Sequence, residues 1–378
     1  MTITDRSDST APRTVEEPER VATVIVGAGQ TGLATAYFLG RAGVPCVVLD
    51  EHARVGDQWR QRYDSLLLNT PAQYDGLPGL PFPAPRGSYP TGAEMGDHLE
   101  RYAAEMDLTV RCDVAVRAVE QQPDGGWRIT TSDGVLLADD VVVACGAETV
   151  SRVPDVADEL DPGIRQLHSS EYHGPAQLLP GPVLVVGASQ SGADLALEAA
   201  QAGHDTWLSG EAKPEIPVPF GSRRARMAQP VLWFLVNHVL TVRTPMGRRM
   251  QPVVRAGGTP LVRVRRADLA AAGVHLVEQR TTRTDDDGRP VLADGTVLDV
   301  ANVLWCTGFR QEFGLISPDV TAEDGYPRGD GGIVEDLPGL YFVGLLFQTA
   351  FSSMLIGGAA RDAKRIAAHI AARARRSA

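Results

Sequence analysis

Two glycine-rich stretches carry residue types that suit the pyrophosphate of a dinucleotide. The letters VIVGAGQTG occupy 24–32, and the letters LVVGASQSG occupy 184–192. The first glycine of such a stretch permits a tight turn, the second lets the backbone approach a pyrophosphate, and the third lets a helix pack closely on the preceding strand. The N-terminus of that helix offers free N–H groups and a partial positive charge to the phosphates. The residues expected to bind the first nucleotide here are Gly27, Gly29, Gln30, Thr31 and Gly32.

A carboxylate marks the first of these sites and is missing from the second. Asp50, followed by Glu51, ends the next apolar run after the first stretch, where it can hydrogen-bond a ribose diol. The two units align at a constant offset, so the position equivalent to Asp50 is Gly210. In the second stretch, Ser189 replaces the middle glycine. Without a carboxylate to repel a 2′-phosphate, the second site favours NADP(H), although Glu211 works against it.

The 2′-phosphate would need a basic partner, and the sequence leaves two choices open. Lys213 is one, and an arginine cluster is the other. The alternative for the arginines is a solvated loop face. The rest of 213–266 matches no motif, so we expect it to carry much of the substrate specificity. The arginines are Arg223, Arg224 and Arg226.

The elements that must position these residues form an internal repeat. The two stretches start 160 residues apart, at 24 and 184. Helical patterns follow at 33–41 and 193–202, and second apolar strands follow at 46–49 and 206–208. This order is βαβ twice, the start of two doubly wound parallel sheets.

Later strands repeat as well. Hairpins are expected at 127–137 and 290–298, because apolar runs flank the turns Asp133-Gly134 and Asp294-Gly295. They feed buried strands at 141–144 and 303–305, and a final strand at 339–344 precedes a helix at 358–373.

One domain inserted within another explains this order. The fold class is therefore α/β, with two Rossmann-like, three-layer dinucleotide-binding domains, the NADP domain lying inside a discontinuous FAD domain. We expect a disordered tail at 1–20, an FAD domain at 21–166 and 301–378, and an NAD(P)H domain at 167–300. The Pro/Gly-rich stretch 77–90 is expected to be a surface loop.

The composition of the chain limits which classes of partner it is expected to bind. The 378 residues carry a net charge of −11, which argues against nucleic acid and against electrostatic attachment to anionic lipid. No apolar run approaches the ~20 residues of a membrane span, so no membrane insertion is expected. Four cysteines without a C-x-x-C pair indicate neither a zinc ribbon nor a dithiol centre and fit a cytoplasmic location; no metal site is expected.

Further motifs give the chain a family likeness. It resembles the class B flavin-dependent monooxygenases, above all the single-chain flavin-containing and YUCCA-like enzymes, from about Val21 to Ile370. The matching stretches besides the glycine motifs are GDQW at 56–59, Tyr63, Leu66, Leu68, Pro71, HSSEY at 168–172, ACG at 144–146, CTGF at 306–309 and GLYFVG at 339–344.

The resemblance implies an enzyme that uses FAD and NADPH, with NADH possible. NADPH would reduce the flavin, and O₂ would then give a C4a-(hydro)peroxyflavin that transfers one oxygen atom to a small molecule. The atom oxygenated would be N or S, or a carbonyl carbon in Baeyer–Villiger fashion. The protein would shield and position, while the cofactor does the chemistry. The oligomeric state is left open.

The resemblance also assigns residues. Asn69 is implied to face the flavin as a catalytic amide, with a turn residue before Thr70-Pro71 as the alternative. Trp59 is implied to pack near the flavin, or else to be a core aromatic. His168 is implied to link the domains, or else to be a surface or capping histidine. Substrate-pocket residues would be Phe351, Ser352 and Ser353, or else these form a helix start. Implied cofactor contacts are Gln58, Trp59, Cys145, Gly146, Gly187, Ser189, Gln190, Ser191, Gly192, Lys213, Gly308, Gly344 and Gln348.

Departures from the family pattern keep other functions open. The F-x-G-x-x-x-H fingerprint is absent, since no Phe stands two before Gly163 and His168 lies one residue too far along, which weakens a Baeyer–Villiger assignment. The alternatives are an NAD(P)H-dependent reductase of a disulfide or electron carrier, and a non-catalytic redox-sensing flavoprotein. The lack of a C-x-x-C pair counts against the disulfide version.

Overall fold

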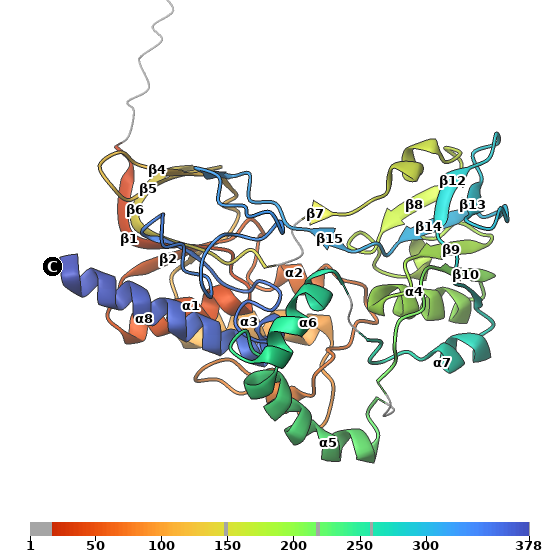
Figure 1. Ribbon diagram of the computed structural model, residues 1–378, viewed down its shortest axis with the longest axis horizontal. Coiled ribbons are helices and arrows are strands. Elements are labelled where there is room, and N and C mark those ends of the chain that lie inside the picture. Colours follow the sequence, from red (N-terminus) through yellow and green to blue (C-terminus); the bar gives the residue numbers. More distant parts are fainter. Residues whose placement is uncertain (1–16, 147–149, 217–219, 258–259, 378) are drawn as a thin grey trace, which may run out of the picture.

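Two parallel-rich sheets organise the chain, and each is covered by its own helices (Figure 1). The computed structural model describes residues 17–146, 150–216, 220–257 and 260–377. Most of the expected disordered tail lies outside these residues. Its last two positions do not fit that expectation, because the first strand, β1 (Glu19–Val26), already begins there and pairs with Leu136 and Leu137.

The first sheet has eight strands in the order β16-β4-β5-β6-β1-β2-β3, with β17 paired to β6. Its parallel centre is buried on both faces, which explains the near-continuous apolar runs of these strands. The predicted hairpin is confirmed: β5 pairs antiparallel with β6, which continues without a break into the predicted strand at 141–144. The remaining strands are β2 (Cys46–Leu49), β3 (Val110–Arg111), β4 (Val116–Gln121), β5 (Trp127–Thr131), β6 (Gly134–Val143), β16 (Ile316–Ser317) and β17 (Leu340–Phe342).

Three helices cover one face of this sheet, and the antiparallel strands curl over the other. Alternate residues of the central strands divide between the two cores, so that Ile25 faces the helices and Val24 faces the hairpin side. The helices are α1 (Gln30–Arg41), α3 (Gly92–Glu105) and α8 (Ala359–Ser377), and α8 confirms the predicted C-terminal helix. The stretch 77–90 carries no helix or strand, but Leu77 and Phe82 are buried in the helix-side core, so it is more than a surface loop.

The second sheet has five parallel strands in the order β11-β10-β9-β14-β8. Two helices pack on one face, and the short hairpin β12–β13 with a 3₁₀ turn packs on the other. The elements are β8 (Arg165–His168), β9 (Val183–Val186), β10 (Thr206–Ser209), β11 (His275–Val277), β14 (Asn302–Trp305), α4 (Gln190–Gln201), α7 (Arg266–Ala271), β12 (Thr281–Thr284), β13 (Pro290–Leu292) and η2 (Asp155–Glu159).

The chain passes between the sheets twice, and the two passages lie side by side. β7 (Val150–Ser151) pairs antiparallel with β15 (Phe309–Arg310), which joins the start of the insertion to its end (Figure 1). The fold class is thus confirmed, but the expected boundaries at 166/167 and 300/301 need correction. They cut through β8 and leave β14 out, although hydrogen bonds hold both strands in the second sheet.

A helical segment between β10 and α7 returns to the first unit. It consists of α5 (Arg223–Phe234), the π-turn η4 (Leu235–Val239) and α6 (Pro245–Arg255), and we call 220–257 the helical insertion. Val242 N donates to Thr349 O at 3.0 Å, and the Trp233 ring stacks on Tyr74 at 4.6 Å between centroids. α5 lies at the lower edge in Figure 1, away from both sheets. No helix in the described part of the chain is long and apolar enough to cross a membrane.

Candidate dinucleotide sites and the region between them

The first glycine turn joins β1 to α1 and leaves no room for side chains at two of its glycines. Gly27 has φ of +105°, and a Cβ atom there would lie 2.8 Å from the carbonyl oxygen of Ala144. A Cβ on Gly32 would lie 2.0 Å from the carbonyl oxygen of Gly27. These two glycines therefore hold the turn against the end of β6.

Gly29 has a different role. Its φ of −73° and ψ of 179° suit any residue, and a Cβ there would meet a single atom of the described chain within 4 Å, Nε2 of Gln58 at 3.4 Å. The fold does not need a glycine at this position. Gly29 precedes α1, whose N-terminus has no side-chain cap, so the N–H groups of Gln30 and Thr31 begin an open helix end. A bare backbone in front of an uncapped helix is the arrangement that binds a pyrophosphate.

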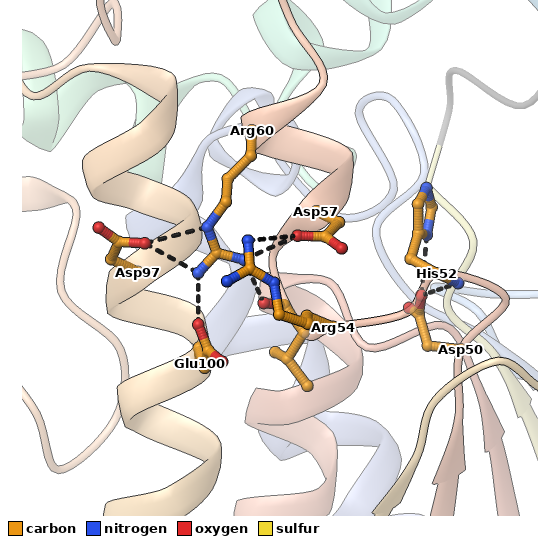
Figure 2. Close-up of polar contacts among 8 residues, drawn as sticks. Asp50, His52, Arg54, Asp57, Arg60, Asp97 and Glu100 are labelled. Carbon is orange, nitrogen blue, oxygen red and sulfur yellow. Dashed lines mark hydrogen bonds and ion pairs between the residues drawn. The ribbon is translucent and has the colours of Figure 1, made fainter.

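Asp50 lies beside this turn, at the carboxyl end of β2. Its Oδ2 accepts a hydrogen bond from Ala28 N at 2.6 Å. Its Oδ1 accepts from His52 N at 3.0 Å and lies 2.8 Å from His52 Nδ1 (Figure 2). Burial works to raise the pKa of Asp50, but the hydrogen bonds from His52 and Ala28 outweigh it and hold the pKa below its usual value. The same bond raises the pKa of His52. Glu51 next to it is exposed.

A short helix, α2 (Asp57–Arg60), carries Gln58 and Trp59 and places Gln58 next to the turn. Arg60 anchors α2 to α3, since its guanidinium lies 2.9 Å from Asp57, 2.9 Å from Asp97 and 2.6 Å from Glu100 (Figure 2). It also donates to Val55 O at 2.9 Å. The backbones of the two helices touch, because a Cβ on Gly56 would lie 2.3 Å from Gly96 O.

Gln58 supplies an independent sign of a missing ligand. Its Oε1 is buried and has no hydrogen-bond partner among the described residues. A buried amide oxygen without a partner is costly, so a ligand group is expected to satisfy it. Since Nε2 of the same side chain faces Gly29, the amide lies at the mouth of the uncapped helix. Trp59 is half-buried and packs against the helix-side core, which fits the core-aromatic alternative.

The C-terminal loop after β17 also meets the turn. Gly344 has φ of +85°, and a Cβ there would lie 2.7 Å from Thr31 Oγ1. The side-chain amide of Gln348 is already engaged: Nε2 donates to Phe342 O at 2.8 Å and to Gly331 O at 3.1 Å, and Oε1 accepts from Leu345 N at 3.3 Å. The side-chain amide of Gln348 therefore fixes the loop.

Two further predicted residues follow β6. Cys145 is exposed, and its backbone N would lie 3.3 Å from a Cβ on Gly27. Gly146 has φ of +77° with open space around it. Cys145 therefore borders the first turn, and Gly146 follows it directly in the chain.

The second glycine turn repeats the first. Gly187 has φ of +111°, and a Cβ there would lie 2.3 Å from Cys306 O; a Cβ on Gly192 would lie 1.7 Å from Gly187 O. Ser189 precedes α4 and gives it no side-chain cap, so this helix N-terminus is open too. Ser191 lies half-buried in the first turn of α4.

Two neighbours of the second turn are tied to other parts of the chain. The amide of Gln190 donates to Pro260 O, and Gly308, with φ of +80°, accepts from Arg152 N at 2.9 Å. Gln190 is thus occupied by the segment that follows the helical insertion.

The two sites differ at the position where the first has Asp50 and the second has Gly210. Gly210 has φ of +142°, and a Cβ there would lie 3.0 Å from Ala188 N, the amide equivalent to the one that Asp50 accepts from. Glu211 is exposed and Lys213 is half-buried just beyond β10. Arg223, Arg224 and Arg226 lie on α5, which packs on the loop 73–89 of the first unit, where Gln229 Nε2 donates to Tyr89 Oη at 3.0 Å.

Asn69 is exposed, and its side chain makes no hydrogen bond within the described part of the chain. The next residue, Thr70, donates from Oγ1 to Oδ1 of Asp75, which is fully buried. The other oxygen of Asp75 has no partner among the described residues. Burial raises the pKa of Asp75 to about 7, although the hydrogen bond from Thr70 lowers the pKa in part.

The predicted substrate pocket lies in η5 (Phe351–Met354) and is largely buried. Ser353 Oγ accepts from Thr349 N and Ala350 N, each at 3.1 Å, which is a helix-start role. Ser352 is 1% exposed. Phe351 is half-buried, lies edge-on to Phe347 with centroids 6.2 Å apart and donates from its N to Leu240 O at 2.8 Å.

His168 is buried at the junction of the units. Its Nε2 lies 3.1 Å from Gly308 O, its Nδ1 lies 2.8 Å from Ser170 Oγ, and its ring meets Phe309 edge-on. Burial lowers its pKa, so the ring is neutral and the contacts are those of a structural link.

Several residues near these sites were missed by sequence reasoning. Phe347 is fully buried with φ of +49°, a conformation that non-glycine residues rarely adopt. Tyr63 donates to Asp194 Oδ2 at 2.8 Å, and Arg263 pairs with the same oxygen at 2.7 Å, so three distant segments meet. Asp194 is buried and lies four residues after Gln190, in the helix that follows the second glycine motif. An acidic residue in this apolar helix was the one feature of the sequence that could have indicated the cluster. The described residues contain no His, Cys, Asp or Glu group that could hold a metal.

Known proteins resemble this chain over most of its length. The family described as pyridine nucleotide-disulphide oxidoreductase matches residues 24–215. A CzcO-like uncharacterized oxidoreductase of Geobacillus kaustophilus is 32% identical over 343 residues, which is 90% of this chain and 95% of that protein. A probable indole-3-pyruvate monooxygenase of Arabidopsis thaliana, YUCCA8, is 28% identical over 92% of this chain and 88% of its own length.

A solved structure agrees with these sequences. The flavin-containing monooxygenase from Stenotrophomonas maltophilia superposes with a TM-score of 0.75 at 27% identity, over 94% of this chain and 99% of that one. The likeness spans both units, so it covers the two glycine turns together.

Proposed function

Because this chain belongs to the pyridine nucleotide-disulphide oxidoreductase family, and within it to the class B flavin-dependent monooxygenases, we propose that it oxygenates a small molecule at N or S using FAD, NAD(P)H and O₂. The observation that carries this proposal is the pair of glycine turns, each ahead of an uncapped helix. The flavin, when bound, supplies the redox and oxygen chemistry. The chain supplies binding, orientation and shielding.

The first turn is proposed to hold FAD. The backbone at Gly29 would admit the pyrophosphate, the N–H groups at the start of α1 would bind it, and Asp50 would accept from the ribose. The unpartnered Oε1 of Gln58 supports this site, because a group of the cofactor would satisfy it. Gly344 would let the C-terminal loop close over Thr31 without a clash.

The second turn is proposed to hold the nicotinamide dinucleotide, with NADPH preferred over NADH. Gly210 supports this preference, since it leaves no carboxylate beside Ala188 N to repel a 2′-phosphate. Lys213 is the better candidate for the phosphate contact, because the arginines of α5 belong to a helix that packs on the first unit.

Asn69 is proposed to act at the reacting atoms. Its exposed amide, free of partners within the described chain, could donate to a group bound in the site and accept from the carboxamide of a nicotinamide. Phe351 is proposed to line the substrate pocket, whereas Ser352 and Ser353 would support it from behind.

N- or S-oxygenation is preferred to carbonyl oxygenation because the Baeyer–Villiger fingerprint is absent. A disulfide reductase is the main alternative, since the family name includes such enzymes. The cysteines count against it: all four are free, and burial raises the pKa of Cys46 to about 11 and raises that of Cys306. Such thiols stay protonated and react poorly with disulfides. Free thiols also fit a reducing compartment such as the cytoplasm.

Stopped-flow spectroscopy of the purified protein tests this function. The flavin should bleach with NADPH without oxygen, and admission of O₂ should give a transient absorbance between the oxidised and reduced flavin bands. Rapid electron transfer to an artificial acceptor without that transient would favour a reductase. Product analysis with panels of amines, sulfides and ketones would then assign the oxygenated atom, and a ketone-only profile would overturn the N- or S-preference.

A further inference from the structure

The helix α5 contacts the first unit through Gln229 and Trp233 and turns most of its other apolar residues outward. On the inner side, Gln229 Nε2 donates to Tyr89 Oη at 3.0 Å, and Trp233 stacks on Tyr74. No residue of α5 is buried. An ordinary surface helix points its apolar residues at the core, so α5 has the opposite arrangement.

The outer face is a continuous apolar stripe. Met227, Val231, Phe234 and Leu235 follow the spacing i, i+4, i+7 and i+8, which places them on one side of a helix. Their exposed fractions are 80%, 63%, 57% and 39%. This face points away from the contacts with Tyr74 and Tyr89, and α5 lies at the edge of the molecule (Figure 1).

Exposed large apolar residues gather on the helical insertion. Ten such residues occur in the described chain, and seven of them belong to α5, the π-turn and α6. The other three are scattered over the second unit and its approach, at Val153, Leu179 and Val297. A gathered exposed patch marks an interaction surface, whereas isolated residues do not. The seven are Met227, Val231, Leu232, Phe234, Leu235, Met246 and Val253.

The same segment is exclusively basic. Between 216 and 262 the sequence has seven Lys or Arg residues and no Asp or Glu, although the whole chain carries −11. Six of these arginines are exposed, and none of the six forms an ion pair with a described residue. They are Arg223, Arg224, Arg226, Arg243, Arg248 and Arg249.

We propose that the helical insertion docks on the surface of an anionic lipid bilayer. Apolar side chains flanked by arginines match such a surface, since the apolar groups enter the headgroup region while the arginines meet lipid phosphates. A second copy of this chain fits less well, because two such faces meeting about a two-fold axis would oppose arginine to arginine. The rest of the chain carries a net negative charge, which an anionic bilayer repels, so the proposal places the docking on this face.

The whole-chain charge pointed the other way. A net charge of −11 argued against lipid attachment, but it averages a basic segment with an acidic remainder. Docking of this kind needs no spanning helix, in agreement with the helices of the described chain.

Vesicle sedimentation of the FAD-loaded full chain tests the proposal. We expect binding to vesicles of phosphatidylcholine with phosphatidylglycerol, at least tenfold weaker binding to phosphatidylcholine alone, and loss of binding at about 0.5 M salt. The variant Met227→Ser/Val231→Ser/Phe234→Ser should bind about tenfold more weakly or worse. The variant Arg223→Gln/Arg224→Gln should do the same on anionic vesicles; Arg226 is kept, because its side chain lies against Gly87 of the first unit.

Matched controls come from exposed residues elsewhere. Val153→Ser/Leu179→Ser/Val297→Ser removes comparable apolar groups, and Arg375→Gln/Arg376→Gln removes the same number of charges, so both should bind as the parent does. The proposal is overturned if no vesicle is bound, or if the control variants lose binding equally. It is also overturned if the chain ignores vesicles but forms a dimer that the Met227, Val231 and Phe234 substitutions dissociate. Unchanged melting temperatures and FAD content would show that each variant is folded.

Discussion

At the scale of single residues, the three glycines of the first turn can be separated by what surrounds them. Side chains at Gly27 and Gly32 would strike backbone atoms, so substitutions there would damage the fold. Gly29 has ordinary backbone angles and space for a Cβ. A substitution at Gly29 therefore reports on the ligand rather than on the fold.

We predict that Gly29→Val lowers bound FAD at least tenfold while the apoprotein stays folded. The valine side chain would fill the approach of the pyrophosphate, at a backbone position that costs the fold little. Gly40→Val on the same helix is the control, because a Cβ at Gly40 meets nothing within 4 Å in the described structure. Flavin absorbance per protein and circular dichroism measure the two effects. Retention of FAD by Gly29→Val would remove the first turn from the cofactor site.

A second prediction concerns Asn69, whose amide is exposed. Asn69→Asp replaces the NH₂ donor by a negative charge, so hydrogen peroxide released per NADPH should rise about two- to tenfold, as expected for losing a hydrogen bond of about 1 kcal/mol. Gln61→Glu makes the same charge change at a nearby exposed position and should leave the ratio unchanged. Peroxide and NADPH are assayed together during turnover. Equal coupling in both variants would leave Asn69 as a turn residue.

Asp75 gives a prediction about pH. Its folded pKa of about 7 exceeds the ordinary value of 3.8, so between these values the native protein holds a proton that the unfolded chain has released. Stability from this group is therefore complete below about pH 4 and is lost as pH rises through 7. Asp75→Asn should match the parent at pH 4 and be more stable at pH 8, by roughly 1–3 kcal/mol.

Urea unfolding at several pH values measures this difference. The exposed Asp124→Asn should show no such divergence. Parallel pH profiles for the parent and Asp75→Asn would mean that the carboxyl is ionised in the native state. The sequence could not have shown this group, because its burial depends on segments distant in the chain, whereas a glycine turn is encoded in nine consecutive residues.

At the scale of elements, α2 is too short to hold itself and depends on α3. Its four residues have no buried member, and Arg60 joins it to Asp97 and Glu100 of α3. α3 in turn is fixed by a capping box at Thr91 and Glu94. Gln58 and Trp59 are thus positioned by the contacts of Arg60 with Asp97 and Glu100, which lie about 40 residues later in the sequence.

Arg60→Lys should loosen this arrangement. A lysine cannot serve three carboxylates and the Val55 carbonyl at once, so we expect a loss of about 1–2 kcal/mol, reduced because Asp97 and Glu100 are partly exposed. FAD affinity should fall about tenfold as Gln58 shifts. Arg54→Lys is the control, since that side chain is 58% exposed and makes one ion pair at 3.3 Å. Thermal melts and flavin titration measure both; equal effects in the two variants would contradict the role of Arg60.

Local patterns predicted the elements well where each strand or helix follows from its own residues. The βαβ repeats, the hairpin β5–β6 and α8 were all read from periodicity and turn residues. The membership of β14 in the second sheet was not predicted, because the sequence of an apolar strand does not specify which strands pair with it. The contact of the helical insertion with Thr349 and Tyr74 was invisible for the same reason.

At the scale of the whole molecule, the proposed function requires a fixed relative position of the two units, and two features hold the units together. One is the paired passage β7–β15. The other is the cluster of Tyr63 from the first unit, Asp194 from α4 and Arg263 from beyond the helical insertion. Arg263 also donates to Ser65 O at 2.9 Å, so it joins both units. Burial raises the pKa of Asp194, but its charge is offset by Arg263.

Tyr63→Phe tests whether this cluster sets the relative position of the units. The substitution removes one hydrogen bond of about 1 kcal/mol between them and keeps the Arg263–Asp194 pair. We expect the rate of flavin reduction at saturating NADPH to fall about three- to tenfold, because hydride transfer depends on the alignment of two bound rings. FAD content should be unchanged, since no FAD contact is lost. Tyr102→Phe is the control: it also loses one hydrogen bond, to Pro78 O at 2.8 Å, but entirely within the first unit. Stopped-flow reduction of both variants distinguishes alignment from stability, because a stability effect would slow them equally, whereas loss of alignment would slow Tyr63→Phe alone.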